Sequence, residues 1–170
     1  NNLKISYNDT KEFVANAVKK SINRHIISDV PLGIFLSSGI DSATIAGNLN
    51  NSKSSITGLT INFDEFLNTN EDEAISAKKI ADYYGIKHHK RTVSKNEFEN
   101  DFLSILTSMD QPTIDGVNTW YASKAAHEAN IKVVLSGVGG DELFFGYPSF
   151  KDIPTINMLN SVLLSTKIMA

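Results

Sequence analysis

Cysteine is absent from the 170-residue chain. Its absence excludes disulfide bonds, thiolate metal sites and cysteine nucleophiles. Any catalysis by these residues must therefore use oxygen or nitrogen groups, or a bound ion. The sequence also lacks internal repeats and low-complexity segments.

Long apolar runs and long basic runs are missing as well. No apolar run approaches the length needed to cross a bilayer, and the polar residues 1–4 lack the basic-then-apolar order of a secretory signal. The net charge of -3 argues against a phosphate backbone or an anionic membrane as the main partner. We therefore expect a cytoplasmic protein that binds neither nucleic acid nor membrane.

The apolar content is sufficient for one hydrophobic core. Hydrophobic residues make up 41% of the chain, and this length favours one domain over two. We expect a single domain over residues 1–170.

Short apolar segments alternate with segments of helical spacing. The apolar segments do not alternate with polar residues, which favours a parallel sheet with helices on both faces. The predicted fold class is α/β, a three-layer sandwich with a mainly parallel sheet. The expected strands are residues 31–36, 55–63, 86–93 and 131–135, and the expected helices are 10–26, 43–49, 70–84, 97–109 and 119–129.

Helix ends and buried faces follow from the same spacing. Asp9 or Thr10 is expected to cap the first helix, and Asn70 with Glu73 resembles a capping box at the third. Gly85 should end that third helix. The residues expected to face the core are Phe13, Val14, Ala17, Val18, Ile22, Ala74, Ala77, Ile80, Ala81, Phe98, Phe102, Ile105 and Leu106.

Two loops of small residues, 37–42 and 136–142, follow predicted strands at their carboxyl ends, where parallel sheets bind ligands. The loop Ser37-Ser38-Gly39-Ile40-Asp41-Ser42 has small side chains, hydroxyl groups and a following helix, as a phosphate site requires. It is neither a Walker A loop nor a dinucleotide fingerprint. Taken alone, it fits a helix-capping turn equally well.

Asp41 distinguishes this loop from an ordinary anion site. A carboxylate inside a phosphate cradle would repel the phosphate unless a cation lies between them. Asp41 therefore predicts Mg²⁺ as a partner of the bound phosphate.

Several motifs in order carry a resemblance to a known family. The lead-in at residues 30–36, the serine loop at 37–42, Asp110-Gln111-Pro112 and the segment 135–147 all contribute. Together they resemble the asparagine synthetase family of ATP pyrophosphatases, whose phosphate loop is Ser-Gly-Gly-x-Asp-Ser. The similarity runs from about Thr10 to Pro154 and implies the PP-loop fold, also called adenine nucleotide alpha hydrolase-like.

The resemblance assigns roles to residues of both loops. Asp41 and Asp141 would be the catalytic residues, because each would be a ligand of Mg²⁺. ATP would be the nucleotide, with its departing pyrophosphate held in the first loop and its adenine near backbone at the strand ends. The residues implied to bind ATP are Leu36, Ser37, Ser38, Gly39, Asp41, Ser42, Ile61, Ser136 and Gly137.

The reaction implied by the resemblance is activation of a carboxylate, with aspartate as the default acceptor, followed by attack of ammonia. Two alternatives stay open. One is an enzyme of the same fold with another acceptor, which amidates a sugar acid, closes a lactam or activates a nucleotide base. The other is an ATP-binding or scaffold module without catalysis. The family's glutaminase nucleophile is a cysteine in a separate domain, so a glutaminase domain or subunit is an expected partner. A homodimer is also compatible with the sequence.

The sequence departs from the family pattern at three points. Ser38 replaces the usual glycine, which adds a side chain at a point of close backbone approach. Val138 stands where well-known members have an acidic residue, although a bacterial subgroup often has an apolar one. The family's synthetase region also continues beyond the equivalent of Ala170, which leads us to expect a fragment of a longer enzyme.

Smaller features have simpler explanations. His88 and His89 are adjacent on a predicted strand, so they should face opposite sides and not share a metal. Trp120 and Tyr121 are expected in the core. The loop that contains Asp115 and Asn118 is the best candidate to face the acceptor substrate. 

Overall fold

The computed structural model describes residues 6–49 and 56–157. The chain divides into two compact units, Asn1–Ser136 and Gly137–Ala170, and each is described by itself. Within the described residues, no helix has both the length and the apolar character needed to cross a membrane.

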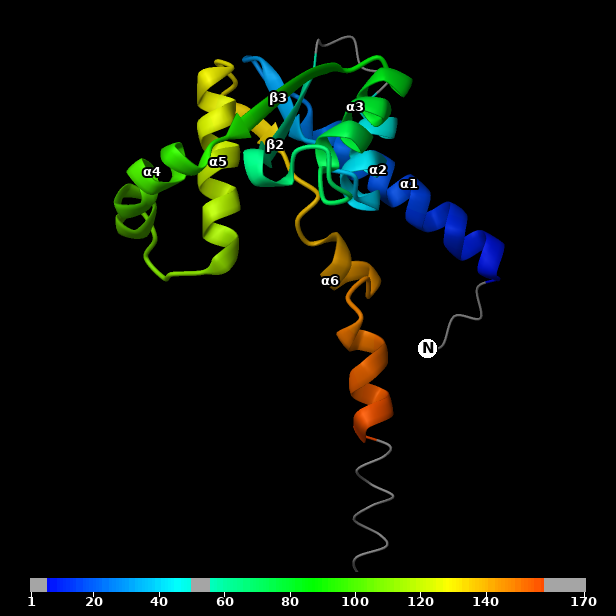
Figure 1. Cartoon of the computed structure of the whole chain (residues 1–170). Coiled ribbons are helices and arrows are strands. Elements are labelled where there is room, and N and C mark those ends of the chain that lie inside the picture. The colour runs from blue at the N-terminus through cyan, green and yellow to red at the C-terminus, as the bar shows by residue number, and fades with distance from the viewer. Residues whose placement is uncertain (1–5, 50–55, 158–170) are drawn as a thin grey trace, which may run out of the picture. The chain divides into compact units, whose positions relative to one another are not determined.

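The first unit is built on a four-stranded sheet in the order β3-β2-β1-β4 (Figure 1). Its strands are β1 (Leu32–Phe35), β2 (Ile56–Phe63), β3 (Lys87–Val93) and β4 (Val133–Leu135). Every neighbouring pair is parallel, so all four carboxyl ends lie at one edge of the sheet. The predicted parallel α/β sheet is confirmed.

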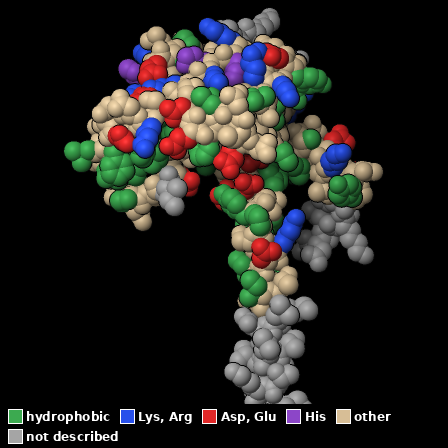
Figure 2. All heavy atoms as spheres, viewed as in Figure 1, with side chains coloured by type: hydrophobic (Ala, Val, Ile, Leu, Met, Phe, Trp, Pro, Cys, Tyr) green, Lys and Arg blue, Asp and Glu red, His purple; other side chains and the backbone are tan. Residues whose placement is uncertain are grey.

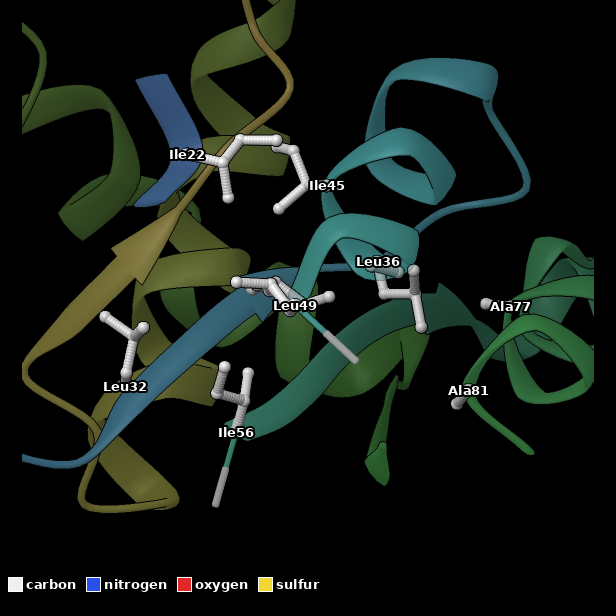
Figure 3. Packing of buried hydrophobic residues seen from close by; sticks show 10 residues of the cluster. Ile22, Leu32, Leu36, Ile45, Leu49, Ile56, Ala77 and Ala81 are labelled. Atoms are coloured by element: carbon white, nitrogen blue, oxygen red, sulfur yellow. The ribbon is translucent and has the colours of Figure 1, made fainter. Parts of the chain in front are cut away.

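Helices cover both faces of this sheet. One face carries α1 (Tyr7–His25), α2 (Ile40–Leu49) and α3 (Glu73–Tyr83), whose apolar side chains pack on β1 and β2 (Figure 3). On the other face, α4 (Lys95–Thr107) and α5 (Ile114–Glu128) enclose smaller apolar clusters. A single 3-10 turn, η1 (Asp64–Phe66), follows β2. The three-layer architecture is therefore as predicted.

The first core is centred on β1. Ile34 and Leu36 are buried there with Ile45 and Leu49 of α2. On α3 the predicted inward alanines, including the fully buried Ala77, allow that helix to approach the sheet closely. Gly85, at φ +65°, ends α3 as expected because glycine adopts the left-handed region without strain.

The predicted helix starts need correction. Ser6 caps α1 by accepting a hydrogen bond from the amide of Asp9 at 3.2 Å, in place of Asp9 or Thr10. Asp72 caps α3 in the same way, accepting from the amide of Ala74 at 3.1 Å, so Asn70 lies outside that helix. In both cases the residue immediately before the helix provides the capping oxygen. Spacing alone does not identify that residue.

The start of α5 also differs. Thr113 caps it, accepting from the amide of Gly116 at 2.9 Å, and the helix begins at Ile114, five residues before the predicted 119. Asp115 and Asn118 are therefore helical, and the prediction that they lie in a loop was wrong. Asp115-Gly116 resembled a turn in sequence, yet Gly116 is accommodated in the first turn of the helix.

Apolar spacing identified the correct helix faces but overestimated how much of each is covered. In α1 the side chain of Ile22 is buried, whereas that of Phe13 is 73% exposed. In α4 Ile105 is buried, whereas Phe102 is 46% exposed. The apolar stripe of α1 thus continues beyond the part of the helix that packs on the sheet.

Charged residues mark the β3 edge of the sheet. Lys87 and Lys90 are exposed on β3, and Lys78 and Lys79 are exposed on α3. Figure 2 shows Lys, Arg and His side chains gathered over this region. Charges on an edge strand discourage pairing with a further strand from another molecule.

An ion-pair network joins β3 to the helices below it. Arg91 donates from Nε to Glu128 Oε2 at 2.7 Å and also pairs with Glu97. Lys124 donates to Glu97 at 2.7 Å and to Asp101 at 2.6 Å. The hydrogen bond from Arg91, the largest influence, and that from Lys124 hold the pKa of Glu97 below its usual value, while burial opposes them. Glu97 thereby links β3, α4 and α5.

The second unit contains α6 (Gly140–Phe144) and a helical segment over residues 149–157. Tyr147 donates its hydroxyl to Glu142 at 2.7 Å, and the ring of Phe150 lies 4.9 Å from that of Phe145. These contacts organise the short stretch between the two helical segments.

The first prediction concerns the core. Ile34→Ala should lower the free energy of unfolding by about 2–5 kcal/mol because it leaves a cavity under β1. Ile27→Ala, whose side chain is 84% exposed, is the control and should change stability by less than about 0.5 kcal/mol. Urea unfolding measures both. Equal losses would contradict the assigned core.

The second prediction concerns pH. Because the pKa of folded Glu97 lies below its ordinary value of 4.5, its contribution to stability is complete above that pH and is lost as the pH falls through the folded value. Glu97→Gln should therefore flatten the acid side of the stability–pH curve. Glu99→Gln, exposed on the same helix, should leave the curve unchanged. An unaltered acid slope in Glu97→Gln would refute the linkage.

Candidate functional site

The serine loop runs directly into a helix. The structure starts α2 at Ile40, three residues earlier than predicted, so Asp41 and Ser42 lie in its first turn. The first N–H groups of a helix have no partner inside it and carry a partial positive charge. The loop thus presents the end of a helix that favours anions, at the carboxyl end of β1.

Hydroxyl groups inside the loop hold its shape. Ser42 Oγ accepts from the amide of Ser37 at 3.2 Å and lies 3.0 Å from Ser37 Oγ. Ser37 Oγ accepts from the amide of Gly39 at 3.1 Å. The Ser42 hydroxyl lies within hydrogen-bonding distance of the carbonyl oxygens of Ser37 and Gly39, to which it can donate. Ser42 is buried. Its hydroxyl thus connects the two ends of the turn, residues 37 and 42, by hydrogen bonds.

Ser38 fits this loop without backbone strain. It is exposed, and it is not among the non-glycine residues with positive φ, which in the described chain are Asn68, Asn130 and Phe145. A left-handed conformation would have favoured glycine. The departure from the family's glycine is therefore compatible with the closed loop.

Asp41 is half-buried in the first turn of α2. A carboxylate at this place stabilises a helix by itself, through the partial positive charge of the amino terminus. That structural role competes with the predicted role as a magnesium ligand. The two differ in their consequence, because only a ligand would make ATP binding depend on the metal.

The other predicted residues of the first unit lie at the same sheet edge. Leu36 follows β1 and is buried, its amide donating to the carbonyl of Leu59 at 2.8 Å. Ile61 lies near the end of β2 with its side chain toward α5. Ser136 follows β4, which pairs with β1 in the register Ile34↔Leu135. Three neighbouring strands thus bring these residues to one edge.

The order of the strands changes direction at this point. From β1 the chain proceeds to β2 and β3 on one side, whereas β4 pairs on the other side of β1. A reversal of this kind is the topological switch at which open parallel sheets bind ligands. The serine loop follows β1, as predicted, and β1 is the strand at which the order reverses.

The second unit contains Gly137 and Asp141. Asp141 is exposed in the first turn of α6, and its carbonyl accepts from the amide of Gly146 at 2.9 Å. Its carboxylate lies over Gly146 so closely that a Cβ there would overlap it. The absence of a side chain at Gly146 therefore leaves the room that this carboxylate occupies, a role that its sequence motif did not reveal.

The pairing of Asp41 with Asp141 stays a prediction, since the two residues belong to different units. In the described parts of the chain, no group of three or more His, Asp or Glu residues is arranged to hold a metal. Magnesium bound to a nucleotide does not require one, because phosphate oxygens and water complete its octahedron beside one or two carboxylates.

The smaller features are resolved by the structure. Tyr121 is fully buried and Trp120 packs beside it, so both belong to the core as predicted. His88 and His89 point to opposite faces of β3. His88 has a partner that the sequence did not reveal: its Nε2 lies 2.8 Å from Thr60 Oγ1.

The chain is similar to several known proteins over most of its length. The chain is 33% identical over 141 residues to "Asparagine synthetase [glutamine-hydrolyzing] 1" of Bacillus subtilis, covering 82% of this chain and 22% of that protein. It is 30% identical over 146 residues to a putative asparagine synthetase 1 of Methanocaldococcus jannaschii, covering 84% and 26%. "Amidase chyE" of Penicillium rubens is 28% identical over 162 residues, covering 84% and 24%. This chain spans about a quarter of the length of these relatives.

Among solved structures, the NH3-dependent NAD synthetase from Campylobacter jejuni aligns with a TM-score of 0.48 at 16% identity, covering 84% of this chain and 61% of that one. NMN synthetase from Francisella tularensis aligns with a TM-score of 0.46 at 22% identity, covering 76% and 54%. The family model for asparagine synthase matches residues 14–167. Because that match includes both small-residue loops and most of the sequence, the chain belongs to the asparagine synthase family.

Proposed function

We propose that this chain binds ATP through the loop 37–42 and is part of an enzyme that activates a carboxylate as an acyl-adenylate and converts it to an amide. The observation that carries the proposal is the closed serine loop at the amino end of α2, located at the topological switch. Membership of the asparagine synthase family supports it.

The loop suits the departing pyrophosphate. Its internal bonds hold Ser37 and Ser42 in place before a ligand arrives, so little further ordering is needed on binding. The helix end adds N–H donors and a favourable dipole. As the bond to the α-phosphorus breaks, the developing negative charge on pyrophosphate would be stabilised by these fixed groups.

Asp41 and Asp141 are the proposed holders of Mg²⁺. Both are carboxylates in the first turn of a helix that follows a strand and a small-residue loop. Their hard oxygen ligands suit magnesium. When bound, the ion would supply positive charge that neutralises the phosphates. The chain's own part is to present the two carboxylates, Asp41 from the first turn of α2 and Asp141 from the first turn of α6, where Gly146 leaves room for it.

The proposed reaction has two steps. An oxygen of the acceptor carboxylate attacks the α-phosphorus in line, and the bond to the pyrophosphate oxygen breaks. Ammonia then attacks the acyl carbon, AMP leaves with the bond electrons, and the nitrogen loses a proton to give the amide. Positioning and charge neutralisation provide most of the rate enhancement in such displacements.

Aspartate is the proposed acceptor, and glutamine hydrolysis in a separate domain or subunit is the proposed ammonia source. The relatives named asparagine synthetase support aspartate, whereas the relative named "Amidase chyE" favours testing other carboxylates as well. Pyrophosphate and AMP release, measured with a series of acids plus ammonia, separate these acceptors. Binding of Mg-ATP without AMP formation from any acid would identify a binding module instead.

The third prediction tests the metal role of Asp41. Asp41→Asn should weaken Mg-ATP binding by roughly tenfold or more, since it removes a charged ligand. ATP affinity without magnesium should change little. Isothermal titration calorimetry with and without the metal measures both.

The matched control is Asp29→Asn. It makes the same charge change at an exposed residue before the amino end of β1, and should leave Mg-ATP affinity as it is. If Asp41→Asn keeps wild-type affinity while lowering thermal stability, Asp41 serves the helix alone and the metal role is refuted.

The fourth prediction concerns Gly146. Gly146→Ala places a Cβ where the Asp141 carboxylate lies, so that carboxylate must move. Mg-ATP affinity should fall by roughly 10-fold to 100-fold, as is usual when a residue that orients a metal ligand is lost. Ser149→Ala, exposed in the same unit, is the control. Unchanged Mg-ATP affinity in Gly146→Ala would contradict a role for the present Asp141 position.

A further inference from the structure

A series of side-chain hydrogen bonds leads from β3 to the start of the serine loop. The hydroxyl of Thr60, on β2, donates to the carbonyl of Leu36 at 2.6 Å. The same Oγ1 lies 2.8 Å from Nε2 of His88 on β3. The three adjacent strands β1, β2 and β3 are thereby connected through side chains, in addition to the backbone bonds of the sheet.

The number of available protons determines which group donates in each of these two hydrogen bonds. The carbonyl of Leu36 can only accept, so the single proton of the Thr60 hydroxyl is used in that bond. Thr60 Oγ1 must then accept at its contact with His88, because it has no second proton to give. His88 therefore carries its proton on Nε2 and donates it to Thr60.

The Leu36 carbonyl belongs to the peptide unit that begins the loop. The other side of this peptide is the amide of Ser37, which donates to Ser42 Oγ at 3.2 Å. The Leu36–Ser37 peptide plane is therefore held at both its oxygen and its nitrogen, by Thr60 and by Ser42. Rotation of this plane would reorient the whole turn from Ser37 to Ser42.

The surroundings of His88 favour the neutral form of its ring. Burial lowers its pKa, and the nearby charge of Lys78 lowers it further, as do His89 and Lys90, while Asp82 opposes them. Lys78 and Asp82 also pair with each other on α3. In this neutral form, the hydrogen-bond direction places the single ring proton on Nε2.

We propose that His88 is a positioning residue of the phosphate loop, acting through the Thr60 hydroxyl to fix the Leu36–Ser37 peptide. His88 touches neither substrate nor metal in this role. The part of the inference that concerns ATP rests on the proposed function, whereas the part that concerns the loop conformation does not.

Two pairs of variants test the role. The side-chain amide nitrogen of glutamine reaches the place of Nε2, whereas that of asparagine reaches only the place of Nδ1, so His88→Gln can donate to Thr60 and His88→Asn cannot. Thr60→Ser keeps the hydroxyl and Thr60→Val removes it with little change in shape. The 170-residue chain is used throughout.

His88→Gln and Thr60→Ser should keep the wild-type backbone amide signals of Ser37 and Gly39 in a ¹⁵N–¹H spectrum and nearly wild-type Mg-ATP affinity. His88→Asn and Thr60→Val should shift both signals and weaken Mg-ATP binding about three- to tenfold, the worth of one hydrogen bond. In the wild type, ¹⁵N shifts of the His88 ring should show the proton on Nε2.

The inference is overturned if the ring proton is on Nδ1, or if His88→Asn and Thr60→Val leave the Ser37 and Gly39 signals in place. If His88 and Thr60 served stability alone, all four variants would change stability, and the two conservative variants would not differ from the other two in their loop signals. Should the wild type fail to bind Mg-ATP, the proposed function fails, but the ring tautomer and the loop signals still decide the positioning role.

Discussion

The site depends on one peptide plane, that between Leu36 and Ser37. A loop that binds phosphate through small residues has few side-chain contacts of its own, so its conformation must be fixed by hydrogen bonds at its ends. Here the oxygen of the plane is held by Thr60 from the neighbouring strand, and the nitrogen is held by Ser42 from the following helix. The sheet and the helix thus determine together where the turn can lie.

The two predicted magnesium ligands, Asp41 and Asp141, each lie in the first turn of a helix. Asp41 stands at the positive end of α2, where its charge is stabilised even without a ligand. Asp141 lies in the first turn of α6, and its carboxylate occupies space that a side chain at Gly146 would fill. The backbone position of each carboxylate is therefore set within its own unit.

Sequence patterns correctly predicted the features that follow from the order of residues along the chain. The apolar runs located all four strands, and the strand–loop–helix order placed the serine loop at the correct edge, because parallel strands leave little choice of arrangement. Helix starts were less predictable, since Ser6, Asp72 and Thr113 compete with equally good capping residues nearby. The Thr60–His88 bond joins residues 28 apart in sequence, and neither motif nor periodicity signals such a contact.

The structure also explains why the loop accommodates Ser38. The hydrogen bonds that close the turn come from Ser37, Gly39 and Ser42, and none of those bonds uses the side chain at position 38. Gly39 has less freedom: a Cβ there would lie 3.2 Å from Ser37 Oγ, the atom that accepts the Gly39 amide. A side chain at 39 would therefore press on the bond that shapes the loop, whereas the one at 38 lies exposed. The hydrogen-bond pattern thus explains why the loop tolerates a side chain at position 38 and favours glycine at position 39.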